Sequence, residues 1–377
     1  MFRGLPGDNV ENNHSAQADS DTVQDVSATL AHIHERLTRI RTGLANTIVG
    51  QDEVVEQLLI AMLAGGHCIL VGVPGLAKTL LISSLARLID LQFGRVQFTP
   101  DLMPADITGT EVIQEDQATG MREFRFVPGP IFANVILADE VNRTPPKTQA
   151  ALLEAMQERQ VTSGGRKHDL PQPFFVLATQ NPIEQEGTYP LPEAQLDRFM
   201  FMVQVAYPTQ EEELEIVLRT TGEPRESLPA AITGDEFSEM IAVVRRIAIP
   251  PNLALVATEI ARLTRPNRET TPDNDAKKHS VPALINSWVR WGAGPRASQY
   301  IVLAAKARAA MFGSPMVRRE DINAVALPVL RHRIKLNFQA ESEGITVESV
   351  IDHVLEHVDA SIQGSANREQ IAKILRS

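Results

Sequence analysis

Cysteine is nearly absent from this sequence of 377 residues, and basic residues are in the minority. The single cysteine, Cys68, lies in an apolar stretch, which excludes a disulfide framework and favours a reducing, cytoplasmic environment. Aspartate and glutamate outnumber lysine and arginine by 47 to 36, and the formal net charge is −11. Such a chain has no broad basic surface, so direct nucleic-acid binding is not expected, although a local basic stripe is compatible with this charge.

The sequence also lacks an apolar segment at its start. Residues 1–27 are polar and acidic, without the hydrophobic core of a signal peptide, and we expect a disordered acidic tail there. Residues 58–77 form one run that is long and apolar enough to imitate a weak transmembrane helix. Because Gly65, Gly66 and His67 divide this run into a helix end and a strand start, we expect a soluble protein without membrane insertion.

A glycine-rich turn follows an apolar strand predicted around residues 68–71. Such a turn directs backbone N–H groups at phosphates, and the helix predicted to begin near Lys78 adds its partial positive charge. Lys78 would reach the β- and γ-phosphates of ATP, and the Thr79 hydroxyl would ligate Mg²⁺. Ala77 replaces the last glycine of the usual pattern, which predicts a turn without a left-handed residue there. The expected nucleotide contacts are Gly72, Pro74, Gly75, Leu76, Ala77, Lys78, Thr79 and Leu80.

Two adjacent carboxylates end the next apolar stretch, residues 135–138. A fully apolar run is typical of a buried parallel strand, whose carboxyl end would present Asp139 and Glu140 together. Asp139 would hold the Mg²⁺ through its water shell, and Glu140 would polarise the attacking water. A solvated loop start is the alternative for two acids alone. Combined with Lys78, the pair predicts ATP hydrolysis.

Two further positions have a functional and a structural interpretation. Asn181 ends a third predicted strand at residues 174–180, where its amide could orient water opposite Glu140 or could start a turn before Pro182. Val49 precedes an amphipathic helix and could frame the adenine or belong to the core.

The remaining pattern indicates two domains. We expect a nucleotide-binding core at residues 28–207, with a helix starting near Ser27, and a helical domain at 208–377 that begins with a capping box at Thr209 and Glu212. A strand-like insertion at about 98–132 and a hairpin at about 160–172 interrupt the core, either as partner contacts or as plain surface hairpins. Residues 265–278 are predicted to form a surface loop.

The chain resembles the MoxR family of AAA+ ATPases over roughly residues 30–358. The resemblance rests on Gly72 to Thr79, Leu137 to Arg143, Ala178 to Pro182 and Pro192 to Phe199. It implies an α/β P-loop core with a parallel sheet between helices, an all-helical lid, and a ring, commonly hexameric, that remodels proteins with von Willebrand factor type A domains. Ala77 is usual in this family.

The resemblance also assigns roles to polar residues. Asn181 resembles sensor 1, Arg198 resembles an arginine finger that reaches a neighbour's γ-phosphate, and Arg296 resembles sensor 2 at the start of a lid helix that closes over the nucleotide. Intrachain ion pairs are the alternative for both arginines, and the role of Arg143 is left open. The alternatives for the whole protein are a nucleic-acid motor, a metal-chelatase motor subunit and a nucleotide-gated scaffold.

Overall fold

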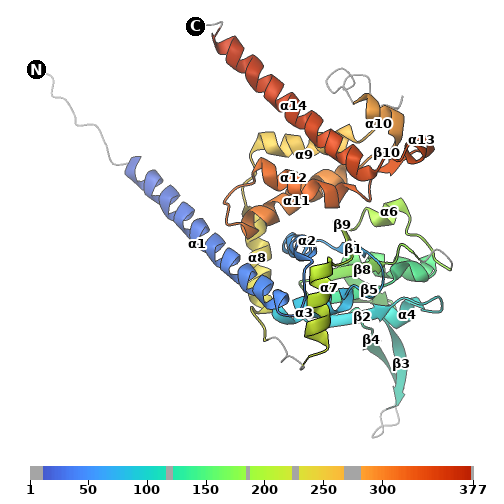
Figure 1. The fold of residues 1–377 in the computed structure, drawn as a ribbon. Coiled ribbons are helices and arrows are strands. Elements are labelled where there is room, and N and C mark those ends of the chain that lie inside the picture. Colours follow the sequence, from blue (N-terminus) through green and yellow to red (C-terminus); the bar gives the residue numbers. More distant parts are fainter. Residues whose placement is uncertain (1–11, 116–121, 184–186, 223–228, 267–281, 375–377) are drawn as a thin grey trace, which may run out of the picture.

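The computed structural model describes residues 12–115, 122–183, 187–222, 229–266 and 282–374 (Figure 1). Its core is a five-stranded parallel sheet with the strand order β2-β5-β8-β1-β9. The strands are β1 (Cys68–Val71), β2 (Phe93–Gln97), β5 (Val135–Asp139), β8 (Phe175–Gln180) and β9 (Phe201–Gln204). We predicted β1, β5 and β8. We missed β2, which lacks an apolar run, and β9, although it lies in the apolar run of residues 199–203.

Both faces of the sheet are covered, because neighbouring residues of each central strand enter different hydrophobic clusters. Ile69 and Ile136 pack in the cluster that contains α5, and Leu70 and Leu137 pack in the cluster that contains α2 and α3. The core helices are α1 (Asn12–Ala45), α2 (Asp52–Leu63), α3 (Lys78–Leu88), a 3-10 turn (Val141–Arg143), α5 (Pro146–Glu158) and α6 (Glu193–Leu196).

The core carries two hairpins, of which β3 and β4 project from it in Figure 1. The insertion contains α4 (Pro104–Thr108), β3 (Gly109–Glu115) and β4 (Arg122–Pro128), and the second hairpin contains β6 (Gln160–Ser163) and β7 (Arg166–Asp169). The rings of Phe126 and His168 stack with their centroids 3.9 Å apart. This contact joins the two hairpins into one projecting unit.

The C-terminal region is mainly helical and packs on the core through α11, which contacts α1 and α2. It contains α7 (Gln210–Thr220), α8 (Gly234–Arg246), α9 (Pro251–Leu263), α10 (Ala283–Trp288), α11 (Pro295–Met311), α12 (Arg319–Leu330), α13 (Phe338–Ser342) and α14 (Val347–Ile374). The prediction of a helical lid is thus confirmed, with the addition of two short antiparallel strands, β10 (Val289–Trp291) and β11 (Lys335–Leu336).

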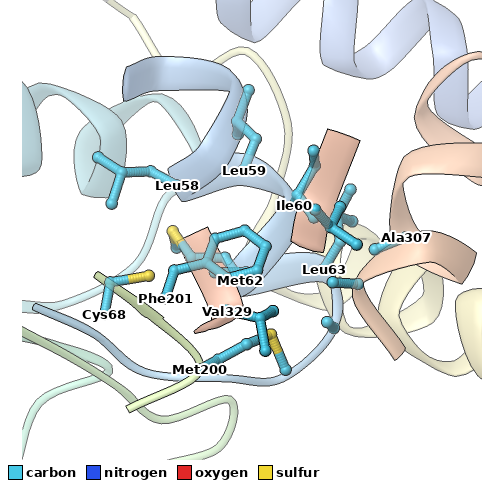
Figure 2. Close-up of a cluster of buried hydrophobic side chains, with 14 of the residues drawn as sticks. Leu58, Leu59, Ile60, Met62, Leu63, Cys68, Met200, Phe201, Ala307 and Val329 are labelled. Carbon is cyan, nitrogen blue, oxygen red and sulfur yellow. The ribbon is translucent and has the colours of Figure 1, made fainter. Parts of the chain in front are cut away.

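Core and lid share one hydrophobic cluster (Figure 2). Met62 of α2 and Phe201 of β9 come from the core, and Ala307 of α11 and Val329 of α12 come from the lid. All four side chains are fully buried. The contact between the two parts is therefore a continuous apolar interior rather than a hinge of loops.

The start of one predicted element differs from the structure. α1 begins at Asn12, before the predicted cap at Ser27 and inside the segment that we expected to be disordered. Most of the predicted 265–278 loop lies outside the described residues. The run at residues 58–77 is divided as predicted, since α2 ends at Leu63 and β1 begins at Cys68. Among the described residues, none of the helices has the length and apolar character needed to cross a membrane.

Candidate nucleotide-binding site

Polar and charged residues gather where three neighbouring strands end. β1, β8 and β5 are parallel, with Val71 opposite Gln180 and Ala138 opposite Ala178. The residues after these strands therefore meet at the carboxyl edge of the sheet, where open α/β sheets bind ligands. A cavity of about 480 Å³ opens at this edge. We call it the nucleotide cavity; it is lined by Pro74, Gly75, Leu76, Ala77, Lys78, Thr79, Leu80, Asp139, Glu140, Thr179, Gln180 and Asn181.

The turn before α3 has a conformation that we did not predict. Ala77 has φ 54° and ψ 22°, which is left-handed, although its Cβ disfavours this region by about 1–2 kcal/mol. Gly75 also has a positive φ of 85°. The two positive-φ residues let the chain reverse between β1 and α3 within a few residues. The prediction for Ala77 was wrong because it rested on the backbone preference of alanine alone. The geometry of the turn, which requires a positive φ at this position, overrides that preference.

The ammonium group of Lys78 lies inside the turn. Its Nζ donates to the carbonyl oxygens of Gly72 and Val73, at 2.9 Å for Val73. Burial lowers the pKa of Lys78, and the carboxylates of Asp139 and Glu140 oppose that shift. A half-buried positive charge is thus held at the N-terminus of α3, where an anion is stabilised.

Both carboxylate oxygens of Asp139 are engaged. Oδ1 accepts from the Thr179 hydroxyl at 2.7 Å, and Oδ2 pairs with Nη2 of Arg95 at 2.7 Å. The Thr179 hydroxyl also accepts the N–H of Glu140 at 2.8 Å. Thr179 therefore fixes the position of both acids relative to β8.

The second acid is held by a single oxygen. Oε2 of Glu140 accepts from Nε2 of Gln97 at 3.1 Å and pairs with Nε of Arg143 at 3.1 Å. Arg143, whose role the sequence left open, is thus an ion-pair partner of Glu140. Asn181 lines the cavity, and its Oδ1 accepts the N–H of Ile183 at 3.1 Å. Asn181 therefore starts the turn and also faces the site.

These groups fit a nucleoside triphosphate with Mg²⁺. Thr79 and Asp139 offer hydroxyl and carboxylate oxygens, the hard donors that Mg²⁺ prefers. The ammonium group of Lys78 donates to two main-chain carbonyl oxygens, and phosphate oxygens can replace these as acceptors. The chemistry of the donor set therefore agrees with the expected cofactors.

Two of the predicted contact residues do not line the nucleotide cavity. Gly72 lies against Val205, the residue after β9; a Cβ would meet the Val205 carbonyl oxygen at 2.7 Å, so only glycine allows this approach. Val49 is half-buried in the segment before α2. This segment contacts the turn, because Nε2 of Gln51 donates to the carbonyl of Leu76 at 3.2 Å.

A second cavity, of about 240 Å³, lies at the opposite end of the sheet. It is lined by His67 and Met200, which directly precede β1 and β9. We call it the arginine cavity, because its lining includes Arg159, Arg198, Arg245 and Arg296. Burial lowers the pKa of His67 to about 4, so at pH 7 the positive charge here comes from the guanidinium groups.

The structure does not bring Arg198 and Arg296 to the nucleotide cavity of their own chain. Nη1 of Arg198 donates to the carbonyl of Leu153 at 2.7 Å, instead of pairing with its neighbour Asp197. Arg296 lies in the first turn of α11, as predicted, but pairs with Asp197 at 3.1 Å. Arg296 therefore lines the arginine cavity and not the nucleotide cavity, which lies at the other end of the strands.

Arg95 and Gln97 were missed at the sequence level. They alternate on β2, where most residues are at least partly exposed, so no apolar run marks the strand. Their contact with the acids depends on the pairing of β2 with β5, in which Gln97 lies opposite Asp139. The two-residue spacing of Arg95 and Gln97 could have indicated that both side chains lie on one face of a strand.

The fold and the nucleotide cavity define a P-loop protein of the AAA+ class. Residues 67–201 match the model of the ATPase family associated with various cellular activities (AAA), and residues 283–354 match that of the AAA lid domain. Chaperone MoxR1 of Mycobacterium tuberculosis is 41% identical over 94% of this chain and 90% of that protein. Protein MoxR of Methylorubrum extorquens is 29% identical over 84% and 92%.

A solved structure agrees with these matches. The crystal structure of a Cytophaga hutchinsonii protein assigned as an ATPase superposes with a TM-score of 0.80 and 39% identity, covering 89% of this chain and 98% of that one. The chain therefore belongs to the MoxR family of AAA+ ATPases.

The conformation of Ala77 leads to a stability prediction. Ala77→Gly should raise the free energy of unfolding by up to about 1 kcal/mol, because glycine adopts a positive φ without the cost of a Cβ. Ala151→Gly, inside α5, is the matched control and should lower it by about 1 kcal/mol. Denaturant titration measures both changes. A loss of stability in both variants would mean that Ala77 is not strained.

The pairing of Arg95 with Asp139 leads to a second prediction. Arg95→Gln should tighten Mg²⁺ binding in the presence of a fluorescent ATP analogue by about two- to five-fold, because a half-exposed guanidinium then no longer competes for the carboxylate. Titration with Mg²⁺ measures the change. Arg122→Gln, which breaks an exposed pair with Glu115 on the insertion, is the control and should have no effect.

Proposed function

We propose that this protein is a Mg²⁺-dependent ATP hydrolase that acts in the cytoplasm as an oligomeric, chaperone-like remodeller of partner proteins. The observation that supports hydrolysis is the gathering of Lys78, Thr79, Asp139, Glu140 and Asn181 around one cavity. A cation, two metal ligands, a carboxylate base and an amide are the groups that phosphoryl transfer to water requires.

Each of these residues has a distinct part in the proposal. Lys78 would bind the β- and γ-phosphates, and Thr79 and Asp139 would ligate the Mg²⁺, which neutralises charge on the phosphates. Glu140 would accept a proton from the attacking water, and Asn181 would orient that water. Gln97 and Arg143 would orient this carboxylate through its Oε2.

The arginine cavity supports a site shared between subunits. Arg198 and Arg296 lie at the other end of the sheet from their own nucleotide cavity, so the phosphates that they neutralise would belong to a neighbouring copy. Guanidinium groups fork onto phosphate oxygens and stay charged, which suits this task. Each site is then incomplete without a neighbour, and a closed ring, which we propose to be hexameric, completes all of them.

The projecting hairpins suit contact with proteins. Ile113 is 63% exposed and Phe124 is 71% exposed, both on the insertion. Exposed apolar side chains on a projection favour a protein partner over a nucleotide. We propose that proteins with von Willebrand factor type A domains are among the partners.

The first prediction of this proposal concerns hydrolysis. Glu140→Gln should bind ATP with nearly unchanged affinity and turn over about 10²- to 10⁴-fold more slowly, because the amide cannot accept the proton. Lys78→Ala should instead lose nucleotide binding. Phosphate release and binding of a fluorescent ATP analogue measure the two effects. Wild-type turnover by assembled Glu140→Gln would refute the assignment of the base.

The same variant, held in the ATP state, is the bait for capturing partners.

The second prediction concerns the shared site. Arg198→Ala should lower turnover by about 10³-fold with little change in nucleotide affinity, because the arginine stabilises charge that develops only in the transition state. Light scattering must confirm an intact oligomer. Arg39→Gln, which breaks an exposed pair on α1, is the control and should behave as wild type. Full turnover by assembled Arg198→Ala would remove Arg198 from the mechanism.

A further inference from the structure

Arg333 is a buried arginine, 5% exposed, in the turn between α12 and β11. Its guanidinium makes five hydrogen bonds, which match its five N–H groups. Nε donates to Oδ1 of Asp197 at 2.8 Å. The terminal nitrogens donate to the main-chain carbonyls of Asp197, Phe199, Met200 and Val329. All but the last of these acceptors lie in the segment 197–200, which contains Arg198.

Two more lid side chains bond to the same segment. The Tyr300 hydroxyl donates to the carbonyl of Arg198 at 3.1 Å, and Nε2 of His332 lies 3.1 Å from the carbonyl of Phe199, to which it can only donate. The ring of Tyr300 also packs on Arg333, with 5.1 Å from Cζ to the ring centroid. Burial raises the pKa of Tyr300, so the phenol keeps the proton that it donates. Every carbonyl from residue 197 to 200 therefore accepts from a lid side chain.

These hydrogen bonds are not needed to attach the lid to the core. The apolar cluster that contains Phe201 and Val329 already joins core and lid (Figure 2). A buried ionic group is seldom more stabilising than apolar residues of the same volume, because desolvation offsets the attraction. Its directional hydrogen bonds do, however, specify one geometry of the main chain. The main chain whose geometry is specified is that of residues 197–200, which includes Arg198.

We propose that Arg333 is a positioning residue for Arg198. Through the main chain of residues 197–200 it holds the Arg198 side chain in the arginine cavity, with Tyr300 as its second support. Because both supporting residues belong to the lid, the packing of the lid on the core holds Arg198 in place. Turnover at the neighbouring subunit's site thereby depends on this subunit's lid. The inference rests on the proposed role of Arg198.

The test is a double-mutant cycle on the full-length, assembled protein. Arg333→Lys keeps the charge but cannot bond to all the acceptors, and it should lower kcat by about ten- to a hundred-fold with nucleotide affinity unchanged. Tyr300→Phe keeps the ring and should lower kcat by about three- to ten-fold. In the Arg198→Ala background, neither substitution should change kcat by more than about two-fold, because both act through Arg198.

The control is Arg308→Gln. Arg308 is another partly buried arginine of the lid, and it pairs with Asp321 at 2.7 Å and Glu56 at 3.6 Å rather than with Asp197. Its loss should leave kcat unchanged. If Arg333→Lys does not fold, Tyr300→Phe decides the question alone, since it removes one hydroxyl.

The outcomes separate this inference from the proposed function. Low turnover of Arg198→Ala together with wild-type turnover of folded Arg333→Lys and Tyr300→Phe would overturn the inference and leave the finger intact. Equal fold losses on the wild-type and Arg198→Ala backgrounds would also overturn it, because they would reveal a purely structural role. Wild-type turnover of Arg198→Ala would instead reject the finger itself, and the inference with it.

Discussion

The register of the parallel sheet is the constraint on which both cavities depend. The central strands are buried on both faces and keep Ile69 and Leu70 in different clusters. A shift of one strand by one residue would move each of its side chains to the opposite face. With the register set, the residues that follow β1, β5 and β8 meet at one edge. The residues that precede β1 and β9 meet at the other edge. One set of hydrophobic contacts therefore places the phosphate-binding turn and the arginines as far apart as the strands are long.

Much of the nucleotide cavity could be predicted from the sequence, and the reason is local. Lys78 directly follows the glycine-rich turn, which is recognisable from its sequence. Asp139 directly follows the apolar run at residues 135–138, which predicts a strand. Arg95 and Gln97 could not be predicted, since their contacts require that β2 pair with β5 across the insertion. Arg333 is further removed, because it meets Asp197 only after the lid has packed on the core. The sequence thus predicts groups carried by their own element better than groups that pairing brings together.

The negative charges of the two acids in the nucleotide cavity are offset by neighbouring cations. Asp139 and Glu140 are adjacent carboxylates, and like charges this close repel unless cations lie beside them. Arg95 and Arg143 each pair with one acid, and Lys78 lies near both. A bound metal and nucleotide would bring charge of both signs, so these pairs must rearrange when the site is filled. The side chains of β2, half-exposed at Arg95, are able to do so without disturbing the core.

The two lid arginines that share Asp197 are not equivalent. Arg333 has a 2% exposed side chain and several main-chain partners, and removing it from Asp197 would leave a buried charge unpaired. Arg296 is 36% exposed and holds the other oxygen of the same carboxylate. Water can replace Asp197 at Arg296 at little cost, but not at Arg333. Asp197 is therefore fixed by Arg333, whereas its pair with Arg296 can open while the segment that carries Arg198 stays in place.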